Sequence, residues 1–435
     1  MTDRYDAIII GAGVIGAAIA LDMARSGYRT LNLDKLPAAG YGSTSNTCAI
    51  IRTHYSTLEG TALAYESLLH WADWPRYLGA TDERGLADFV RSGMVIIRSA
   101  TDSYERHVEL HEQLGIDYEI WDVATLQERL PFYDMRAFHP PRRPEDPQFG
   151  ESTSSSVPGA VFMPNAGYVN DPQLATHNLQ RAAEAHGAEF LFGAAVTEVR
   201  RASGRVAGVT LADGRSLDAP VVVNAAGPHS FLINRMAGIG HDMTVTTRPL
   251  RHEVHYLPRP EGYDAAVHGF FTSDADIGGY TRPEVGDLLL IGSQDPACDP
   301  PDWIEDPDTF DREVTPEQWR AQVYRMALRV PGLPIPTKPK GVADLYDVTE
   351  DWIPIYDRSS LDGFYLAIGT SGNQFKNAPM VGKLVTELVT ACEAGHDHDT
   401  DPVRVAGRYT DLTFDLGFYS RHRTPNRDSS LSVLG

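Results

Sequence analysis

Residues 6–35 constrain the fold more than any other part of the chain. Residues 7–10 (Ala-Ile-Ile-Ile) are short, mostly β-branched and continuously apolar, which is typical of a buried parallel strand. Residues 11–16 (Gly-Ala-Gly-Val-Ile-Gly) then open a stretch with helical spacing of apolar residues, which Gly27 ends. Residues 30–33 (Thr-Leu-Asn-Leu) predict a second strand. The segment is therefore predicted to be a strand–helix–strand unit of an α/β fold.

The three glycines of this unit and the acid that follows it indicate a dinucleotide site. The first glycine permits a tight turn, the second lets the backbone approach a pyrophosphate, and the third allows the helix to pack closely on the strand. The helix N-terminus offers free N–H groups to the phosphates, and an acid 18 residues after the last glycine suits a ribose diol. This pattern alone does not separate NAD from FAD. The predicted contacts are Gly11, Gly13, Val14, Ile15, Gly16, Asp34 and Lys35.

Composition excludes several classes of protein. The chain has 435 residues, of which 42% are hydrophobic and 22% charged, as in ordinary globular proteins of two or three domains. Its 38 basic and 59 acidic residues give a net charge of −21, which disfavours binding to nucleic acid or anionic lipid. Cys48, Cys298 and Cys392 have no metal or disulfide spacing, so a cytoplasmic location is expected. The apolar stretch 7–21 lacks a basic leader and is too short to span a membrane.

Later segments predict further strands and helices. Residues 221–227 read as a buried strand that follows a hairpin-like stretch, 194–217, with a turn at Asp213-Gly214. Residues 363–369 predict another strand, from which Thr370-Ser371-Gly372 leads into a helix that runs through Leu388. Residues 167–172 introduce a helix from about 173 to 186.

Two further motifs accompany the glycine-rich fingerprint. They are Gly42-Ser43-Thr44-Ser45 leading to Ile50-Ile51-Arg52, and residues 371–376 (Ser-Gly-Asn-Gln-Phe-Lys). With these motifs, the sequence from about residue 5 to 395 resembles the D-amino-acid oxidase superfamily of FAD enzymes, and most closely its sarcosine oxidase and dimethylglycine dehydrogenase branch. The resemblance implies that the dinucleotide is FAD.

The resemblance also implies the domain organisation. It predicts an α/β fold with a discontinuous, Rossmann-like FAD-binding domain (1–88, 159–244 and 341–395) and a substrate domain with a mixed, largely antiparallel sheet (89–158 and 245–340). A polar C-terminal tail (396–435) is expected to follow. In the family, the loop after the second strand and the late Ser-Gly loop contact the flavin. The further cofactor contacts implied are Ser43, Thr44, Ser45, Ala226, Gly227, Gly369, Ser371, Gly372, Asn373, Gln374 and Phe375.

The substrate residues implied by the resemblance are Arg52, Lys376, Tyr346 and His54. The arginine and the lysine match positions that hold the substrate carboxylate in the family, where Arg offers two parallel N–H groups and Lys a point charge. Tyr346 matches a tyrosine that lines the substrate pocket. His54, next to Tyr55, is a candidate acceptor of the amine proton. A loop histidine that bonds only to backbone is the alternative.

The chain departs from the family at two places. Monomeric sarcosine oxidases tether their flavin through a cysteine two residues before the pocket tyrosine, but Asp344 stands there, so the FAD is expected to be non-covalent. The family's oxidases also use a lysine over the flavin to promote reaction with O2. No lysine lies between Lys35 and Lys338, although Arg251 or Arg282 could replace it. The electron acceptor is therefore O2 or another molecule.

The sequence thus predicts an FAD-dependent amine oxidoreductase. The expected reaction oxidises the C–N bond of a carboxylate-bearing amino acid, N-methylated or secondary, by hydride transfer to flavin N5, and the resulting imine hydrolyses. The alternatives are a D-amino-acid dehydrogenase, a 2-hydroxy-acid oxidoreductase, or an electron-relay subunit. Residues 138–158 are predicted to be a long loop, either a lid or interface arm or an inert insertion. Residues 395–399, with His396 and His398, are interpreted as a solvated charge run rather than as metal ligands.

Overall fold

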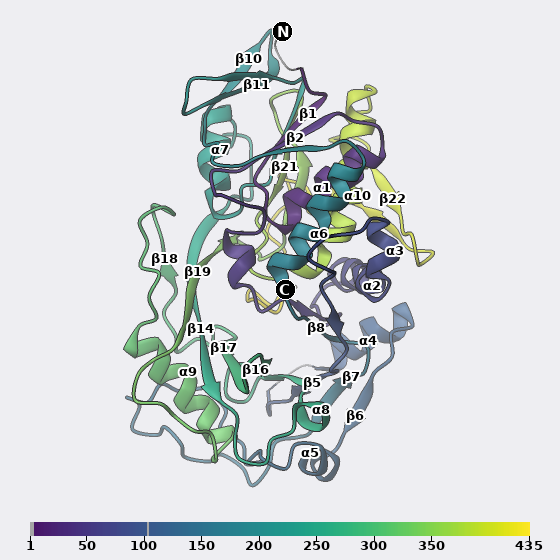
Figure 1. The fold of residues 1–435 in the computed structure, drawn as a ribbon. Helices are drawn as coiled ribbons and strands as arrows, with labels where there is room; N and C mark the ends of the chain where they lie inside the picture. The colour runs from purple at the N-terminus through teal and green to yellow at the C-terminus, as the bar shows by residue number, and fades with distance from the viewer. Residues whose placement is uncertain (1–3, 102–103) are drawn as a thin grey trace.

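The computed structural model describes residues 4–101 and 104–435, which form two regions around a central cavity (Figure 1). The upper region in Figure 1 is built on a six-stranded sheet with the order β20-β21-β13-β1-β2-β9. β1 pairs in parallel with β2 and β13 in register, and β20 is antiparallel to β21. The strands are β1 (Ala7–Ile10), β2 (Thr30–Leu33), β9 (Glu189–Leu191), β13 (Val221–Asn224), β20 (Ile355–Arg358) and β21 (Phe364–Ile368).

Helices α1 (Val14–Arg25), α6 (Pro172–Ala185) and α10 (Ala378–Glu393) pack together on one face of this sheet. The sequence of α1 is rich in small residues, so its neighbours come close: a Cβ on Gly382 of α10 would lie 2.6 Å from the carbonyl oxygen of Ala18. The Asp171 carboxylate caps α6 by accepting a hydrogen bond from the N–H of Leu174. The other face carries β10 (Val196–Ala202), β11 (Arg205–Leu211), β12 (Ser216–Asp218) and α7 (Ser230–Ala237).

The lower region is built on a nine-stranded, largely antiparallel sheet, within which β5 and β15 run parallel. The strand order is β18-β14-β17-β16-β15-β5-β7-β6, with β19 also paired to β14. The strands are β5 (Met94–Ile97), β6 (Glu119–Trp121), β7 (Ala160–Met163), β14 (Arg248–Pro258), β15 (Phe271–Asp274), β16 (Gly279–Glu284), β17 (Leu288–Ser293), β18 (Asp302–Trp303) and β19 (Gly341–Val348). The helices are α4 (Tyr104–Leu114), α5 (Val123–Arg129), α8 (Ala265–His268) and α9 (Pro316–Arg329).

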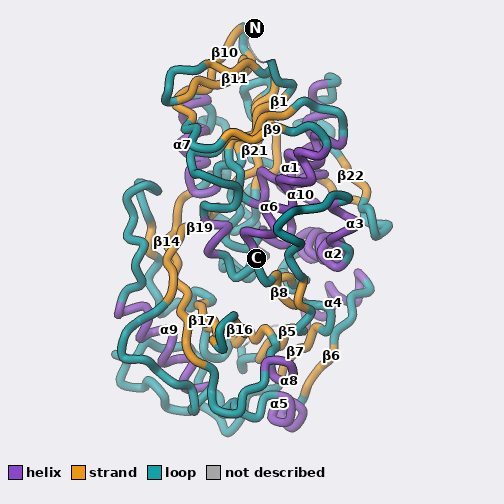
Figure 2. The backbone as a smooth tube through the Cα atoms, in the orientation of Figure 1, coloured by secondary structure: helices purple, strands orange, loops and turns teal. Residues whose placement is uncertain are grey.

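Shorter elements join the two regions (Figure 2). A small sheet, β3-β8-β4, and helices α2 and α3 lie between the large sheets, and the chain's C-terminus is found at the same level. The bounds are η1 (Ser43–Asn46), β3 (Ile50–Ile51), α2 (Leu58–Ala72), α3 (Trp74–Leu78), β4 (Phe89–Val90), β8 (Gly167–Val169), η2 (Gly227–His229) and η3 (Phe375–Asn377). The predicted α/β class with a mixed second sheet is confirmed.

Two expected domain boundaries differ from the hydrogen bonding. Boundaries at residues 159 and 341 would assign β7 and β19 to the first region, but both strands pair within the nine-stranded sheet. β19 links the two regions. It pairs with β14 in the lower sheet, and its Asp347 lies at the edge of the upper sheet. The Asp347 carboxylate there accepts a hydrogen bond from the N–H of Gly369.

The predicted polar tail is an integral part of the upper region. It contains β22 (Arg404–Ala406), β23 (Thr413–Asp415) and η4 (Leu416–Tyr419), whose apolar side chains join the core around α1 and α10. The interpretation of His398 as part of a solvated run is wrong, since its side chain is buried and its Nε2 lies 3.3 Å from Asp357 Oδ1. Within the described part of the chain, this run contributes to no cluster of three metal-ligating side chains.

The long loop 138–158 contains no helix or strand. It packs on α9 and on the loop after β17, where Arg143 pairs with Asp299 at 3.1 Å. None of its residues lines the central cavity. Among residues 4–101 and 104–435, no helix has both the length and the apolar character needed to cross a membrane.

Candidate functional site

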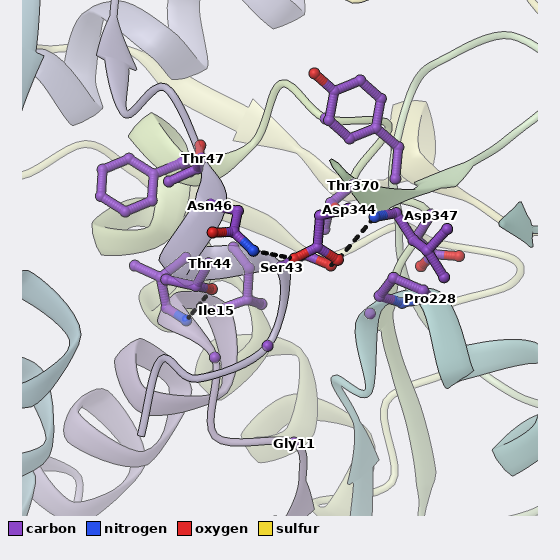
Figure 3. A pocket seen from close by; sticks show the side chains of 18 of the residues that line it. Gly11, Ile15, Ser43, Thr44, Asn46, Thr47, Pro228, Asp344, Asp347 and Thr370 are labelled. Carbon is purple, nitrogen blue, oxygen red and sulfur yellow. Dashed lines mark hydrogen bonds between the residues drawn. The ribbon is translucent and has the colours of Figure 1, made fainter. Parts of the chain in front are cut away.

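One cavity of about 570 Å³ lies between the two large sheets (Figure 3). Its walls come from segments that are distant in sequence. They are the turn from β1 into α1, the loop after β2 through η1, parts of β14 and β19, the segment that leads into η3, and residues 433–434 near the C-terminus. The sequence motifs of the fingerprint, the early loop and the late loop therefore meet at one site.

The turn from β1 into α1, which we call the glycine cradle, is packed so closely against neighbouring backbone that side chains at Gly11 and Gly16 would clash with it. Gly11 has a φ of +107°, and a Cβ there would lie 2.3 Å from the carbonyl oxygen of Ala225. A Cβ on Gly16 would lie only 1.9 Å from the carbonyl oxygen of Gly11, which confirms the predicted close packing of helix on strand. Gly13 borders the cavity and its Cβ would meet only the Thr44 hydroxyl, at 3.1 Å. The N-terminus of α1 therefore opens directly onto the cavity.

The acid at the end of β2 is fixed beside this cradle. One oxygen of Asp34 accepts a hydrogen bond from the N–H of Ala12 at 2.8 Å, and the other accepts from the N–H of Leu36 at 2.9 Å. Burial raises the pKa of this carboxyl group. Lys35, the next residue, points to a loop of the lower region, where its Nζ contacts Asp308 and lies 2.8 Å from His229 Nε2. Asp34 keeps the capacity to accept from a diol.

Asp344 occupies the position expected for a flavin tether in monomeric sarcosine oxidases. Its carboxylate lines the cavity and accepts hydrogen bonds from Ser43 Oγ at 3.1 Å and Asn46 Nδ2 at 2.7 Å (Figure 3). The nearest thiol in the wall, Cys48, has its Sγ 3.2 Å from the hydroxyl of Tyr280. Burial raises the pKa of Cys48, which disfavours the reactive thiolate.

The late loop packs directly against Tyr346. Gly372 has a φ of +68°, and a Cβ on it would lie 2.5 Å from the Tyr346 ring. On its other side, this ring stacks on His252 with a centroid separation of 4.2 Å. Tyr346 and His252 both line the cavity, so they form an aromatic wall in front of the late loop.

Two buried cations face the cavity beside this wall. Arg52 is 4% exposed, and it donates hydrogen bonds to the main-chain carbonyls of His54 and Val433, the latter at 2.8 Å. Lys376 is 3% exposed, and its Nζ donates to the Tyr55 hydroxyl at 3.0 Å and to a carbonyl oxygen at 2.6 Å. Within the described residues, neither cation pairs with a carboxylate. Burial lowers the pKa of Lys376 well below its ordinary value, and the charge of Arg52 lowers it further.

Comparison with known proteins identifies the family. A family model described as "DAO: FAD dependent oxidoreductase" matches residues 6–388. The chain belongs to this family. It is 26% identical over 404 residues to a glycine oxidase from Geobacillus kaustophilus, covering 91% of this chain and 96% of that protein. It is 25% identical over 429 residues to a monomeric sarcosine oxidase from Streptomyces avermitilis, covering 93% and 99%.

A solved structure shares the fold over almost the whole chain. The L-proline dehydrogenase from P. horikoshii superposes with a TM-score of 0.77 and 21% identity, covering 97% of this chain and 98% of that one. The family match makes the chain an FAD-dependent oxidoreductase, and its cavity fits that cofactor. The glycine cradle and the α1 N-terminus suit the pyrophosphate, and Asp34 suits a ribose diol.

Most of the predicted cofactor residues line this FAD cavity. Those in the wall are Gly11, Gly13, Val14, Ile15, Asp34, Lys35, Ser43, Thr44, Ala226, Gly227, Gly372, Asn373, Gln374 and Phe375. Four others, Gly16, Ser45, Gly369 and Ser371, lie outside the wall. These four support its backbone instead: Ser371, for example, donates from its N–H to the carbonyl oxygen of Asp347 at 2.8 Å.

Three of the predicted substrate residues, Arg52, Lys376 and Tyr346, line the cavity, but His54 does not. Its ring is buried and stacks on His107 at a centroid separation of 3.8 Å, and burial lowers its pKa well below the ordinary value. The structure therefore does not place it where it could accept a proton from a ligand. Its contribution is a main-chain carbonyl that holds Arg52.

Neither arginine proposed to replace the oxygen-activating lysine faces the cavity. Arg251 pairs with Glu253 at 2.7 Å, and Arg282 pairs with Glu284 at 3.0 Å. Sequence reasoning also missed three kinds of wall residue: His252 on β14, Asp308 and its loop, and Val433 with Leu434. No sequence motif marks Val433 and Leu434 as wall residues. They are far from the glycine-rich fingerprint in the sequence, and only the fold brings them to the cavity.

Proposed function

We propose that this chain oxidises the C–N bond of a small amino acid whose carboxylate is bound by Arg52 and Lys376. The observation that carries the proposal is that two buried cations line the FAD cavity without a protein counter-ion among the described residues. Buried charges are costly unless they are paired, so this pair of cations favours an anionic ligand. In a chain of net charge −21, their lack of an acidic partner is a specific feature of the site.

The names of relatives support an amino acid as that anion. Glycine oxidase, sarcosine oxidase and L-proline dehydrogenase are named for small amino acids, two of which are secondary amines. The aromatic wall of Tyr346 and His252 suits the apolar part of such a molecule. An N-methylated or cyclic secondary amino acid is accordingly our first choice of substrate.

The residues of the chain act by positioning and charge. Arg52 and Lys376 fix the carboxylate, which holds the neighbouring carbon within the cavity that Tyr346 also lines. FAD, when bound, supplies the two-electron oxidant. The amine must react as the neutral base, and the imine that forms takes up water and gives a free amine and a carbonyl group. Because His54 lies outside the wall, no role in deprotonation is assigned to it.

The test of the anchor is the Arg52→Ala variant, loaded with FAD and reduced anaerobically with sarcosine. Loss of a charge-assisted pair to a carboxylate is expected to raise the apparent dissociation constant by about a hundredfold, with Arg52→Lys recovering part of the loss. The exposed Arg215→Ala variant is the matched control and should behave as wild type. An unchanged dissociation constant in Arg52→Ala would remove the anchor assignment.

A further inference from the structure

The last seven residues, Ser429–Gly435, which we call the C-terminal strap, lie against the cation pair. The main-chain carbonyl of Val433 accepts the hydrogen bond from Arg52, and the strap ends beside Tyr55. The main-chain oxygen of Gly435 accepts from both the N–H and the hydroxyl of Ser56, at 3.1 and 2.6 Å. The strap is therefore seated on the segment that carries Arg52.

Two residues of the strap form part of the cavity wall. Val433 and Leu434 both line the cavity, and Val433 packs against the apolar cluster around Trp352, against which Tyr346 also packs. Since the carbonyl of Val433 touches Arg52, this wall adjoins the proposed carboxylate anchor. In a molecule whose carboxylate is bound there, the groups attached next to the carboxylate would contact the strap.

Among residues 4–101 and 104–435, the strap pairs with no strand and makes few polar contacts with other segments. Apart from the bond to Arg52, these contacts involve Ser56, whose hydroxyl also accepts from the N–H of Ser430 at 3.1 Å. Leu431 in the middle of the strap is 55% exposed and has a φ of +50°. The side chains of such a segment can be substituted without disturbing either large sheet.

We propose that the C-terminal strap is a specificity-determining wall of the substrate site. The carbonyl of Val433 holds the Arg52 guanidinium in place, and Leu434 limits the size of the group attached to the carbon next to the carboxylate. This inference rests on the proposed function, because it takes Arg52 to be the carboxylate anchor. Enlarging the strap side of the cavity should then admit branched carboxylates that the intact site excludes.

The test measures binding without turnover. Acetate and 3-methylbutanoate are titrated into the FAD-loaded full chain, and the change in the flavin absorption spectrum gives a dissociation constant for each. In Leu434→Ala, the preference for acetate over 3-methylbutanoate should fall by about tenfold, because three carbons of the wall are removed. Leu431→Ala is the matched control: it is on the same strap but exposed and outside the wall, and its ratio should stay within about twofold of wild type.

A second variant tests whether the change in preference comes from the strap as a whole and not only from local rearrangement around the substituted Leu434. A chain that ends after Asp428 lacks the whole strap, and its preference should change in the same direction. If neither variant changes the ratio while both carboxylates still bind, the strap is not a specificity wall and the carboxylate anchor stands. If neither carboxylate perturbs the flavin of the wild-type protein, the anchor itself is wrong and the role of the strap falls with it.

Discussion

The cavity contains two regions suited to anions, and they are built by opposite physical means. At the β1–α1 turn, the pyrophosphate cradle uses main-chain N–H groups and the end of a helix, with glycines at the points of closest approach. At the far side, the proposed carboxylate anchor uses two full side-chain charges, Arg52 and Lys376, supported by neutral carbonyl and hydroxyl groups. One region is made of dipoles and the other of charges.

This difference has an energetic consequence. Peptide groups carry no net charge, so a cradle of N–H groups can be buried at moderate cost and does not titrate. Burial lowers the pKa of both Arg52 and Lys376, and the charge of Arg52 lowers the pKa of Lys376 further. The cradle should therefore be sensitive to shape, and the anchor should be sensitive to charge and pH.

The largest expected effect comes from breaking the shape of the cradle. In Gly16→Ala, the added Cβ would lie 1.9 Å from the carbonyl oxygen of Gly11, so the strand and helix must separate. We expect about 3 kcal/mol or more of lost stability and loss of bound FAD. Gly332→Ala is the matched control, because nothing lies within 4 Å of its Cβ. Thermal unfolding and the flavin content of the purified proteins measure both effects; equal values for the two variants would contradict the packing role of Gly16.

A smaller effect is expected in the pH dependence of carboxylate affinity, which should distinguish the anchor from the pyrophosphate cradle. Burial and Arg52 lower the pKa of Lys376 in the empty site, and a bound carboxylate stabilises its charged form. Carboxylate binding should therefore take up a proton, and affinity should fall by up to about tenfold per pH unit as the pH rises above the empty-site pKa. Acetate titrations of the flavin spectrum at several pH values measure this slope.

The control for that experiment is Lys376→Met, which keeps the length of the side chain but cannot titrate. Its acetate affinity should be weaker at low pH, and the slope assigned to the lysine should be missing. Identical slopes in the variant and the wild-type protein would show that Lys376 does not carry the pH dependence. The main-chain N–H groups of the pyrophosphate cradle do not titrate, so FAD retention should not follow the profile of the lysine.

The same contrast explains what the sequence could predict. The strands at residues 7–10 and 30–33 are confirmed to the residue, and the helix expected at about 173–186 is observed as α6 (172–185). These elements depend on local apolar patterns and caps. The cradle is equally local, since its glycines are neighbours in the chain and its acid lies at the end of the next strand.

The features that sequence reasoning missed depend on long-range contacts. The C-terminal strap reads as a polar tail, yet it reaches the cavity because Ser56 and Arg52 hold its carbonyl groups. The predicted domain boundary at residue 341 separates β19 from its sheet, because the local sequence of a strand does not show which strand it pairs with. The chemistry of His54 was plausible from its position beside Arg52, but burial against His107 takes its ring out of the wall. Arg52 and Lys376 were found through a family resemblance, and only the fold brings them to one cavity.

The measurement that tests the central claim most directly is anaerobic bleaching of the FAD-loaded protein with matched pairs of amines. Each pair consists of an N-methyl, cyclic or D-amino acid and its methyl ester, which has the same amine without the carboxylate charge. The account predicts that at least one secondary amino acid bleaches the flavin, that its ester does so at least about a hundredfold less efficiently, and that the rate of recolouring in air shows whether O2 is the acceptor. Equal bleaching by acid and ester, or bleaching by 2-hydroxy acids alone, would contradict the account.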